Sequence, residues 1–281
     1  MAAVDTLLLR RAGRAKKAST IASDKSRING HIKPLLGNLA ADALTAKQIT
    51  KFMHDVAAGK TAKREKLDKK RALSNVRGGK GAATRTVGLL GAIFTYAVTE
   101  GIRPDNPVHG VTRFADKKKD RRLSDVEYEK LGEGLDLAAT GGVNLTGIAA
   151  VRLLILTGWR TGDAVKLLWD NPDTKRRVAR LQDTKSDARV RPLSLSALEL
   201  ILAQPRTSSP YVFPARIANR PLQGLPRMFD AIKEKAKLAE DITPHVLRHS
   251  FCSLAGDPGY NDAVIGALAA CRSEFSNNFV R

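Results

Sequence analysis

Apolar residues recur at helical spacing through the first hundred residues of the chain. Residues 45–48 (Thr-Ala-Lys-Gln) form a capping-box pattern, and the next apolar residues fall on one helical face. A shorter helix is expected over residues 23–36, ending at Gly37, and a longer one from about residue 82 to residue 100. The residues expected on the buried faces are Ile49, Phe52, Met53, Val56, Val87, Leu90, Ile93, Phe94 and Ala97. This pattern predicts a helical first domain.

The pattern becomes mixed in the second half of the chain. Residues 148–157 form an apolar helix, and a turn leads to a second helix over residues 161–169. Residues 178–181 and 189–193 look like two short strands of a hairpin. Helices are also expected to begin at Ser196 and at Thr243-Pro244, where threonine suits the N-cap and proline the first turn. We therefore expect a mainly α protein with a small β-sheet or hairpin (α+β).

A break separates the two parts. Residues 105–107 (Asp-Asn-Pro) interrupt the helical pattern, and residues 117–122 are a charge run without apolar periodicity. Ser124 and Glu127 then form a second capping box, which opens a new helix. We place the domain boundary near residues 113–122. The charge run fits a solvated loop, and it also fits a segment that lies along a phosphate backbone.

The charge balance narrows the class of partner. The chain has 281 residues, and its 48 Lys and Arg against 28 Asp and Glu give a formal net charge of +20. Such an excess repels itself unless it meets a polyanion, so nucleic acid is the first candidate and an anionic membrane the second. A basic but inert surface is the alternative. No stretch approaches the roughly 18 apolar residues of a membrane span, and the basic opening residues fit an amphipathic helix or a transit peptide better than a secretory signal.

Two cysteines, Cys252 and Cys271, are too few for a disulfide framework and do not form a zinc-type pair. Reduced thiols in a cytoplasm fit best.

Polar residues that packing does not explain lie in four stretches. A glycine turn presents Arg160, with Asp163 three residues later. Lys185 lies at the tip of the expected hairpin, before Arg189 and Arg191. On a helix, His245, Arg248 and His249 share one face, and the tail around Cys271 is the fourth stretch. Taken singly, each fits a surface salt bridge, a solvated lysine or a structural histidine.

Taken together, these residues suit a phosphodiester. Two guanidinium groups can fork onto the non-bridging oxygens of a phosphorane. A lysine can protonate a leaving hydroxyl, and a histidine can move the proton of a nucleophile. Preorganised positive charge is the main source of acceleration in phosphoryl transfer.

At these residues the chain resembles the tyrosine recombinase (phage integrase) family. Residues 156–163 (Leu-Thr-Gly-Trp-Arg-Thr-Gly-Asp) are similar to the first-arginine box of that family. Residues 183–185 resemble its lysine hairpin, and residues 243–251 (Thr-Pro-His-Val-Leu-Arg-His-Ser-Phe) its histidine–arginine box. Residues 92–97 followed by Asn106-Pro107 are similar to its core-binding domain.

The resemblance implies three parts. Residues 1–113 would be an N-terminal helical core-binding domain, residues 114–122 a basic linker, and residues 123–281 a catalytic domain altered or truncated at its C-terminal end. Arg160 and Arg248 would hold the phosphate, Lys185 would be the acid for the leaving 5′-oxygen, and His245 would assist proton transfer. His249 has no catalytic role in the family pattern.

The resemblance also implies partners and setting. The protein would cut and rejoin double-stranded DNA through a 3′-phosphotyrosine, in DNA integration or recombination of a mobile element. It would need no metal or other cofactor, no small-molecule substrate and no membrane. It would act as a homotetramer on DNA, in a bacterial or phage-infected cytoplasm at the nucleoid.

The C-terminal end departs from the family pattern. Cys271 stands where the family has a second histidine, and Phe279 is the natural match to the tyrosine nucleophile. Phenylalanine has the ring but no oxygen, so it cannot form the phosphodiester link. Among the tyrosines of the sequence, Tyr260 is the alternative that stands nearest to the histidine–arginine box.

Four interpretations remain open: a site-specific recombinase, a catalytically silent DNA-binding protein or modulator derived from an integrase, a type IB topoisomerase, and an RNA-binding protein. The altered tail favours the second for this chain. The small helical first domain argues against a topoisomerase, and the chain has neither an RNP motif nor a KH pattern.

Overall fold

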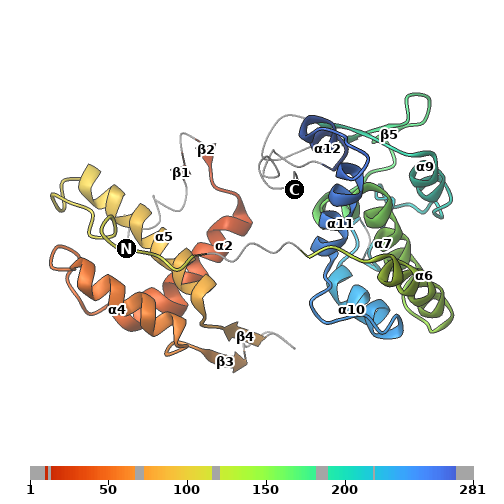
Figure 1. The fold of residues 1–281 in the computed structure, drawn as a ribbon. Helices are drawn as coiled ribbons and strands as arrows, with labels where there is room; N and C mark the ends of the chain where they lie inside the picture. The colour runs from red at the N-terminus through yellow and green to blue at the C-terminus, as the bar shows by residue number, and fades with distance from the viewer. Residues whose placement is uncertain are drawn as a thin grey trace. The chain divides into compact units, whose positions relative to one another are not determined.

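The computed structural model describes residues 10–11, 14–66, 73–115, 121–181, 189–217 and 219–269. The chain divides between Lys118 and Lys119 into two compact units, 1–118 and 119–281, which are described separately (Figure 1). Helices dominate both, and the strands form small antiparallel sheets. The prediction of a mainly α fold with a small β component is confirmed.

The first unit consists of helices with two hairpins. Its elements are β1 (Arg10–Arg11), β2 (Arg14–Ala15), α2 (Ala18–Arg27), the π-helix η1 (Ile28–Ile32), α3 (Lys33–Leu36), α4 (Ala46–Ala57), β3 (Lys63–Lys66), β4 (Leu73–Val76) and α5 (Lys80–Thr99). The helix expected over residues 23–36 therefore begins five residues earlier and contains a π-helical turn.

The core of the first unit lies between α4 and α5. The capping box of Thr45 and Gln48 opens α4 as predicted, with the side chain of each residue bonded to the backbone of the other. All four apolar residues expected on α4 are at most 2% exposed, and they pack against α5 residues such as Val87 and Phe94. Ile93 is the exception among the expected core residues, because it is only partly buried in a small separate cluster near η1.

The hairpin β3–β4 has no counterpart in the sequence prediction, which expects only helices in the first domain. Its register pairs Lys63 with Val76 and Lys66 with Leu73. Charged residues at successive positions hide the period-two pattern that identifies a half-buried strand, so the hairpin had no apolar signal.

The second unit packs helices around one apolar core beside a three-stranded sheet. Its elements are α6 (Asp125–Thr140), α7 (Leu145–Thr157), α8 (Thr161–Val165), β5 (Pro172–Asp173), β6 (Val178–Leu181), β7 (Arg189–Pro192), α9 (Leu195–Leu202), α10 (Leu225–Lys235), α11 (Pro244–Gly256) and α12 (Asp262–Ala269). The sheet order is β5-β6-β7, antiparallel throughout. The capping box of Ser124 and Glu127 opens α6 as predicted.

The end of α8 and the start of α9 differ from the prediction for identifiable reasons. Helix α8 stops at Val165 rather than near Trp169, because the following backbone pairs with residues 210–212: Trp169 N–H donates to the carbonyl of Pro210. The N-cap of α9 is Ser194 and not Ser196. The Ser194 hydroxyl accepts from the N–H of Ala197, which satisfies one of the free donors of the first turn.

A close helix crossing fixes α6 against the end of α10. A Cβ added to Gly134 would lie 2.3 Å from the Cβ of Ala236, so glycine is required for this approach.

Among the residues that the structure describes, none of the helices has the length and apolar character needed to cross a bilayer.

Candidate phosphate-binding site

The turn between α7 and α8 presents Arg160. Helix α7 ends at Thr157, and Gly158 takes a left-handed conformation with φ of 59°. Trp159 turns inward and is 1% exposed, whereas Arg160, the N-cap of α8, is exposed. A Cβ on Gly158 would lie 2.5 Å from the ring of Phe251 in α11. The missing side chain therefore allows the Arg160 turn to lie directly against α11.

Helix α11 carries the predicted histidine–arginine pair. Pro244 occupies its first turn after Thr243, as predicted, although the Thr243 side chain makes no capping hydrogen bond. His245 is exposed, and Arg248 is 5% exposed. The Nη1 of Arg248 donates to the carbonyl of Gly158 at 2.7 Å. This bond joins the predicted second arginine to the turn that carries the first.

Two guanidinium groups hold the C-terminal end of α12. Arg248 donates from the same Nη1 to the carbonyl of Ala269, and Arg191 of β7 donates to the carbonyl of Ala267 at 3.3 Å. Cations at a helix C-terminus oppose the partial negative charge of its last carbonyls. Apolar contacts of Ile265 and Ala269 with Cys252 add to this packing. The last described helix is thus fixed to both β7 and α11.

The two histidines of α11 contact each other. The rings of His245 and His249 meet edge to face, with centroids 4.5 Å apart and an angle of 89° between their planes. His249 is partly buried and His245 is exposed beside it. This contact restricts the orientation of the His245 ring at the surface of α11.

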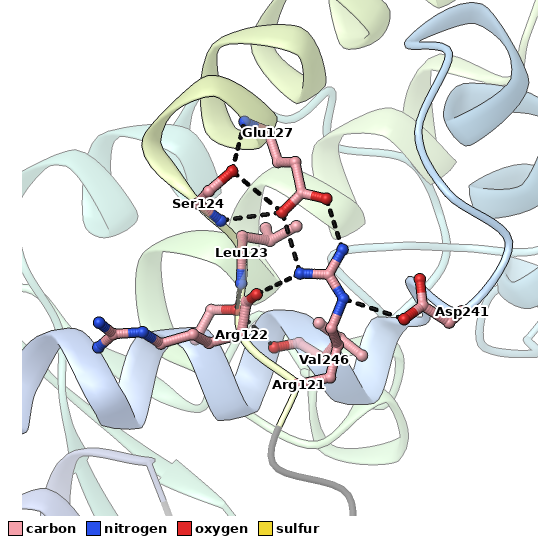
Figure 2. Close-up of polar contacts among 8 residues, drawn as sticks. Arg121, Arg122, Leu123, Ser124, Glu127, Asp241 and Val246 are labelled. Carbon is pink, nitrogen blue, oxygen red and sulfur yellow. Dashed lines mark hydrogen bonds and ion pairs between the residues drawn. The ribbon is translucent and has the colours of Figure 1, made fainter.

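The residues just before α6 contact α11 and the segment that precedes it. Arg121 lies between Glu127 and Asp241, with nitrogen–oxygen distances of 2.5 and 3.0 Å to the nearer oxygens (Figure 2). The N–H of Leu123 donates to the hydroxyl of Ser250 at 2.8 Å. Ser250 is 1% exposed, so this bond is shielded from water.

One further contact joins the residues before α6 to α11. Arg122 pairs with Asp257, the C-cap of α11, at 3.3 Å. The guanidinium of Arg121 holds the pKa of Glu127 at about 2, against an ordinary value of 4.5. The sequence analysis did not predict this network, because Arg121 and Asp241 are about 120 positions apart in the chain. The charge run before Ser124 was the only feature of the sequence that pointed to it.

Other predicted site residues fall elsewhere. Lys185, Cys271 and Phe279 lie outside the described residues. Tyr260 is 56% exposed in the segment between α11 and α12.

Two other features of the second unit are separate from these residues. A cavity of about 550 Å³ lies between α6, α7 and α9. Its lining includes four leucines and one isoleucine but none of Arg160, His245 and Arg248. No group of three or more His, Cys, Asp and Glu side chains is placed to hold a metal ion in the part of the chain that the structure describes.

The fold is similar to solved integrase structures. A lambda integrase dimer bound to a COC′ core site matches with a TM-score of 0.73 at 19% identity, over 98% of this chain and 92% of that one. A lambda integrase tetramer bound to a Holliday junction matches with a TM-score of 0.72 at 18% identity, over 100% of this chain and 79% of that one. The Tn1549 transposon integrase in complex with circular intermediate DNA matches with a TM-score of 0.71 at 16% identity, over 98% and 91%.

Comparison with curated protein sequences gives no match. The sequence model of the phage integrase family, in contrast, matches residues 122–270, which is more than half of the 281 residues. The matched segment includes Arg160, His245 and Arg248. The chain therefore belongs to the phage integrase family, the tyrosine recombinases.

Proposed function

We propose that this protein binds duplex DNA and seats one backbone phosphate on Arg160, Arg248 and His245, with Lys185 as the proton donor to the leaving 5′-oxygen. The first unit would be the core-binding domain and the second the catalytic domain. The observation that carries the proposal is the bond from Arg248 to the carbonyl of Gly158, because it brings the second arginine to the turn of the first.

The exposed and buried groups of this site have different uses. Arg160 and His245 are exposed, so a phosphate oxygen can reach them directly. Arg248 is buried. Its guanidinium lies beside both the end of α12 and the Arg160 turn, because it bonds the carbonyls of Ala269 and Gly158. Charge held in a region of low dielectric acts on a phosphate more strongly than charge in water.

The reaction that suits this site is strand cleavage and rejoining. A hydroxyl oxygen would attack the phosphorus and give up its proton with the help of His245, while the 5′-oxygen would leave with a proton from Lys185. Reversal of this step on a second strand would rejoin the DNA. In this sequence the family's nucleophile position is Phe279, which has no oxygen. We therefore propose that the polypeptide of residues 1–281 binds DNA without forming the covalent link.

The test is a covalent-trapping assay with nicked suicide duplexes that carry the sequence flanking the protein's own gene. Residues 1–281 should give a native gel shift and no band that survives denaturant. Phe279→Tyr restores the hydroxyl and should produce such a band. The loss of a covalent nucleophile costs on the order of a million-fold in rate in another enzyme, so the contrast is large.

Each outcome decides between the candidates. A denaturant-resistant band from the unmodified chain that disappears in Tyr260→Phe would identify Tyr260 as the nucleophile. It would reject the proposal that the chain binds DNA without forming a covalent link. A Phe279→Tyr chain that forms no adduct would reject Phe279 as the nucleophile position. A chain that does not shift duplex DNA even at low salt would overturn the proposed function itself.

The assembly and location follow from the same proposal. The similar solved structures include integrase dimers on a core site and a tetramer on a Holliday junction. We propose that this protein likewise assembles as a homotetramer on two duplexes, in the cytoplasm of a bacterial host. Mass photometry of the protein with and without the duplex would show the change in oligomeric state.

A further inference from the structure

Strand β3 of the first unit is exposed on both of its faces. All four residues of β3, Lys63–Lys66, are exposed, and so is Asn75 of β4. A two-stranded hairpin is marginally stable in water when nothing packs on it. Apolar burial of β3 therefore does not explain why its charged residues are kept in a hairpin.

The base of the hairpin, in contrast, is held firmly. Val76 packs against η1, where a Cβ on Gly30 would lie 3.1 Å from a valine methyl. The buried hydroxyl of Thr61 and Nδ1 of His31 are 2.6 Å apart, and burial lowers the pKa of His31. Just after β4, a Cβ on Gly78 would lie 2.5 Å from the backbone of Gly59. Because its base is packed in this way, the hairpin is held in a fixed orientation relative to η1.

The register sorts the charges between the two faces. Arg64 is paired with Asn75, so these two side chains share a face, and Lys66 lies on the same face because side chains alternate along a strand. Lys63 and Glu65 lie on the opposite face, where their side chains form an ion pair at 3.0 Å. The one acidic residue of β3 is thus turned away from Arg64 and Lys66 and neutralised by Lys63.

Arg77 extends the basic face beyond the strand. With the Asn75 amide in the orientation that satisfies its hydrogen bonds, its oxygen accepts from Nε and Nη2 of Arg77 at 3.2 and 3.3 Å. Among the residues whose side chains the structure describes, this face, here called the basic face, carries Arg64, Lys66, Asn75 and Arg77, which are three cations and an amide with no carboxylate.

The chemistry of the basic face fits double-stranded DNA. The major groove of B-DNA admits a two-stranded ribbon, arginine and lysine bind phosphates and guanine, and asparagine pairs with adenine. The major groove of A-form RNA is too deep and narrow to be read in this way. We infer that the β3–β4 hairpin is a DNA contact of its own, which places its basic face in the major groove; this rests on the proposed DNA binding.

Two lysines of the same strand provide a matched test. Lys66→Gln removes one charge from the basic face, and Lys63→Gln removes one from the opposite face. Binding to a 40-base-pair duplex of mixed sequence is followed by fluorescence anisotropy over a range of salt concentrations. Lys66→Gln should lower the slope of log affinity against log salt by about 1 and weaken binding roughly three- to tenfold, whereas Lys63→Gln should change neither.

The groove is tested with a duplex whose cytosines are glucosylated 5-hydroxymethylcytosine, because the glucose fills the major groove. On this duplex the difference between Lys66→Gln and the unmodified chain should disappear. Thermal unfolding of both variants should match that of the unmodified protein, since both lysines are exposed on the same strand.

The outcomes separate this inference from the proposed function. If the unmodified protein binds the duplex but the two lysine variants bind equally, the hairpin is a solvated charged ribbon and the inference fails alone. If the difference persists on the glucosylated duplex, the basic face does not contact the major groove and the inference also fails. If the unmodified protein does not bind duplex DNA at low salt, both the inference and the proposed function fail.

Discussion

The guanidinium of Arg248 donates a 2.7 Å hydrogen bond to the carbonyl oxygen of Gly158, 90 residues earlier in the chain. The same Nη1 bonds the carbonyl of Ala269. One buried side chain therefore connects the Arg160 turn, helix α11 and the end of α12. The geometry of the candidate site depends on this connection as much as on the exposed residues that would touch a phosphate.

Replacing Arg248 with lysine tests that connection. Lysine keeps the charge but lacks the planar fork, so a buried carbonyl loses its donor, and the free energy of unfolding should fall by about 1–3 kcal/mol. Urea denaturation measures the change. Arg152→Lys is the matched control, because its pair with Asp136 is exposed and should contribute less than about 0.5 kcal/mol. Equal stability of the two variants would contradict a bridging role for Arg248.

Gly158→Ala should damage the turn itself. The left-handed backbone costs about 1 kcal/mol or more for a residue with a Cβ, and the clash with Phe251 adds to this, so a total loss of about 2–4 kcal/mol is expected. Gly162→Ala, in α8 with no atom near its Cβ position, should be neutral or stabilising. In a Phe251→Ala background the cost of Gly158→Ala should shrink to the backbone part. An unchanged cost there would show that the clash is not the cause.

Two glycines of helix α6 should respond in opposite directions to alanine. At Gly134 the new methyl would meet Ala236, so Gly134→Ala should separate α6 from α10 and destabilise the protein by about 2 kcal/mol or more. At Gly132 nothing lies within 4 Å, and alanine should stabilise the helix by about 0.5–1 kcal/mol. Thermal unfolding of the two variants should give shifts of opposite sign.

The pair of Glu127 and Arg121 predicts a pH dependence. The folded pKa of Glu127, about 2, lies below its ordinary value of 4.5, so its contribution to stability is complete above pH 4.5 and is lost as the pH falls toward 2. Glu127→Gln should lower the free energy of unfolding by about 1–2 kcal/mol at neutral pH, since the pair is only partly buried.

The pH profile of Glu127→Gln is the decisive measurement. The difference from the unmodified protein should decrease through the window from pH 4.5 to 2. Asp136→Asn removes an exposed carboxylate paired with Arg152 and should show little effect at any pH. A Glu127→Gln difference that stays constant down to pH 2 would mean that the charge of Glu127 is not responsible.

Local patterns predicted most of the helices of this protein and failed at specific places. The capping boxes at Thr45 and Ser124 identified helix starts, because the required residues are three apart and make their bonds within one turn. Ser196 was wrong as the N-cap of α9, since Ser194 lies close enough to do the same. The end of α8 was also wrong, because a distant segment at Pro210 takes the backbone of Trp169 into a bridge.

The sequence by itself determined the mainly helical fold, the basic character and the order of arginine, lysine and histidine–arginine boxes, since each of these is local or compositional. Only the tertiary structure decided that Arg248 bonds Gly158 and that Arg121 pairs with Asp241. It also decided how the charges of β3 divide between the two faces of the hairpin. These relationships join residues far apart in the chain or depend on strand register. Burial and long-range pairing, which no local pattern encodes, set them.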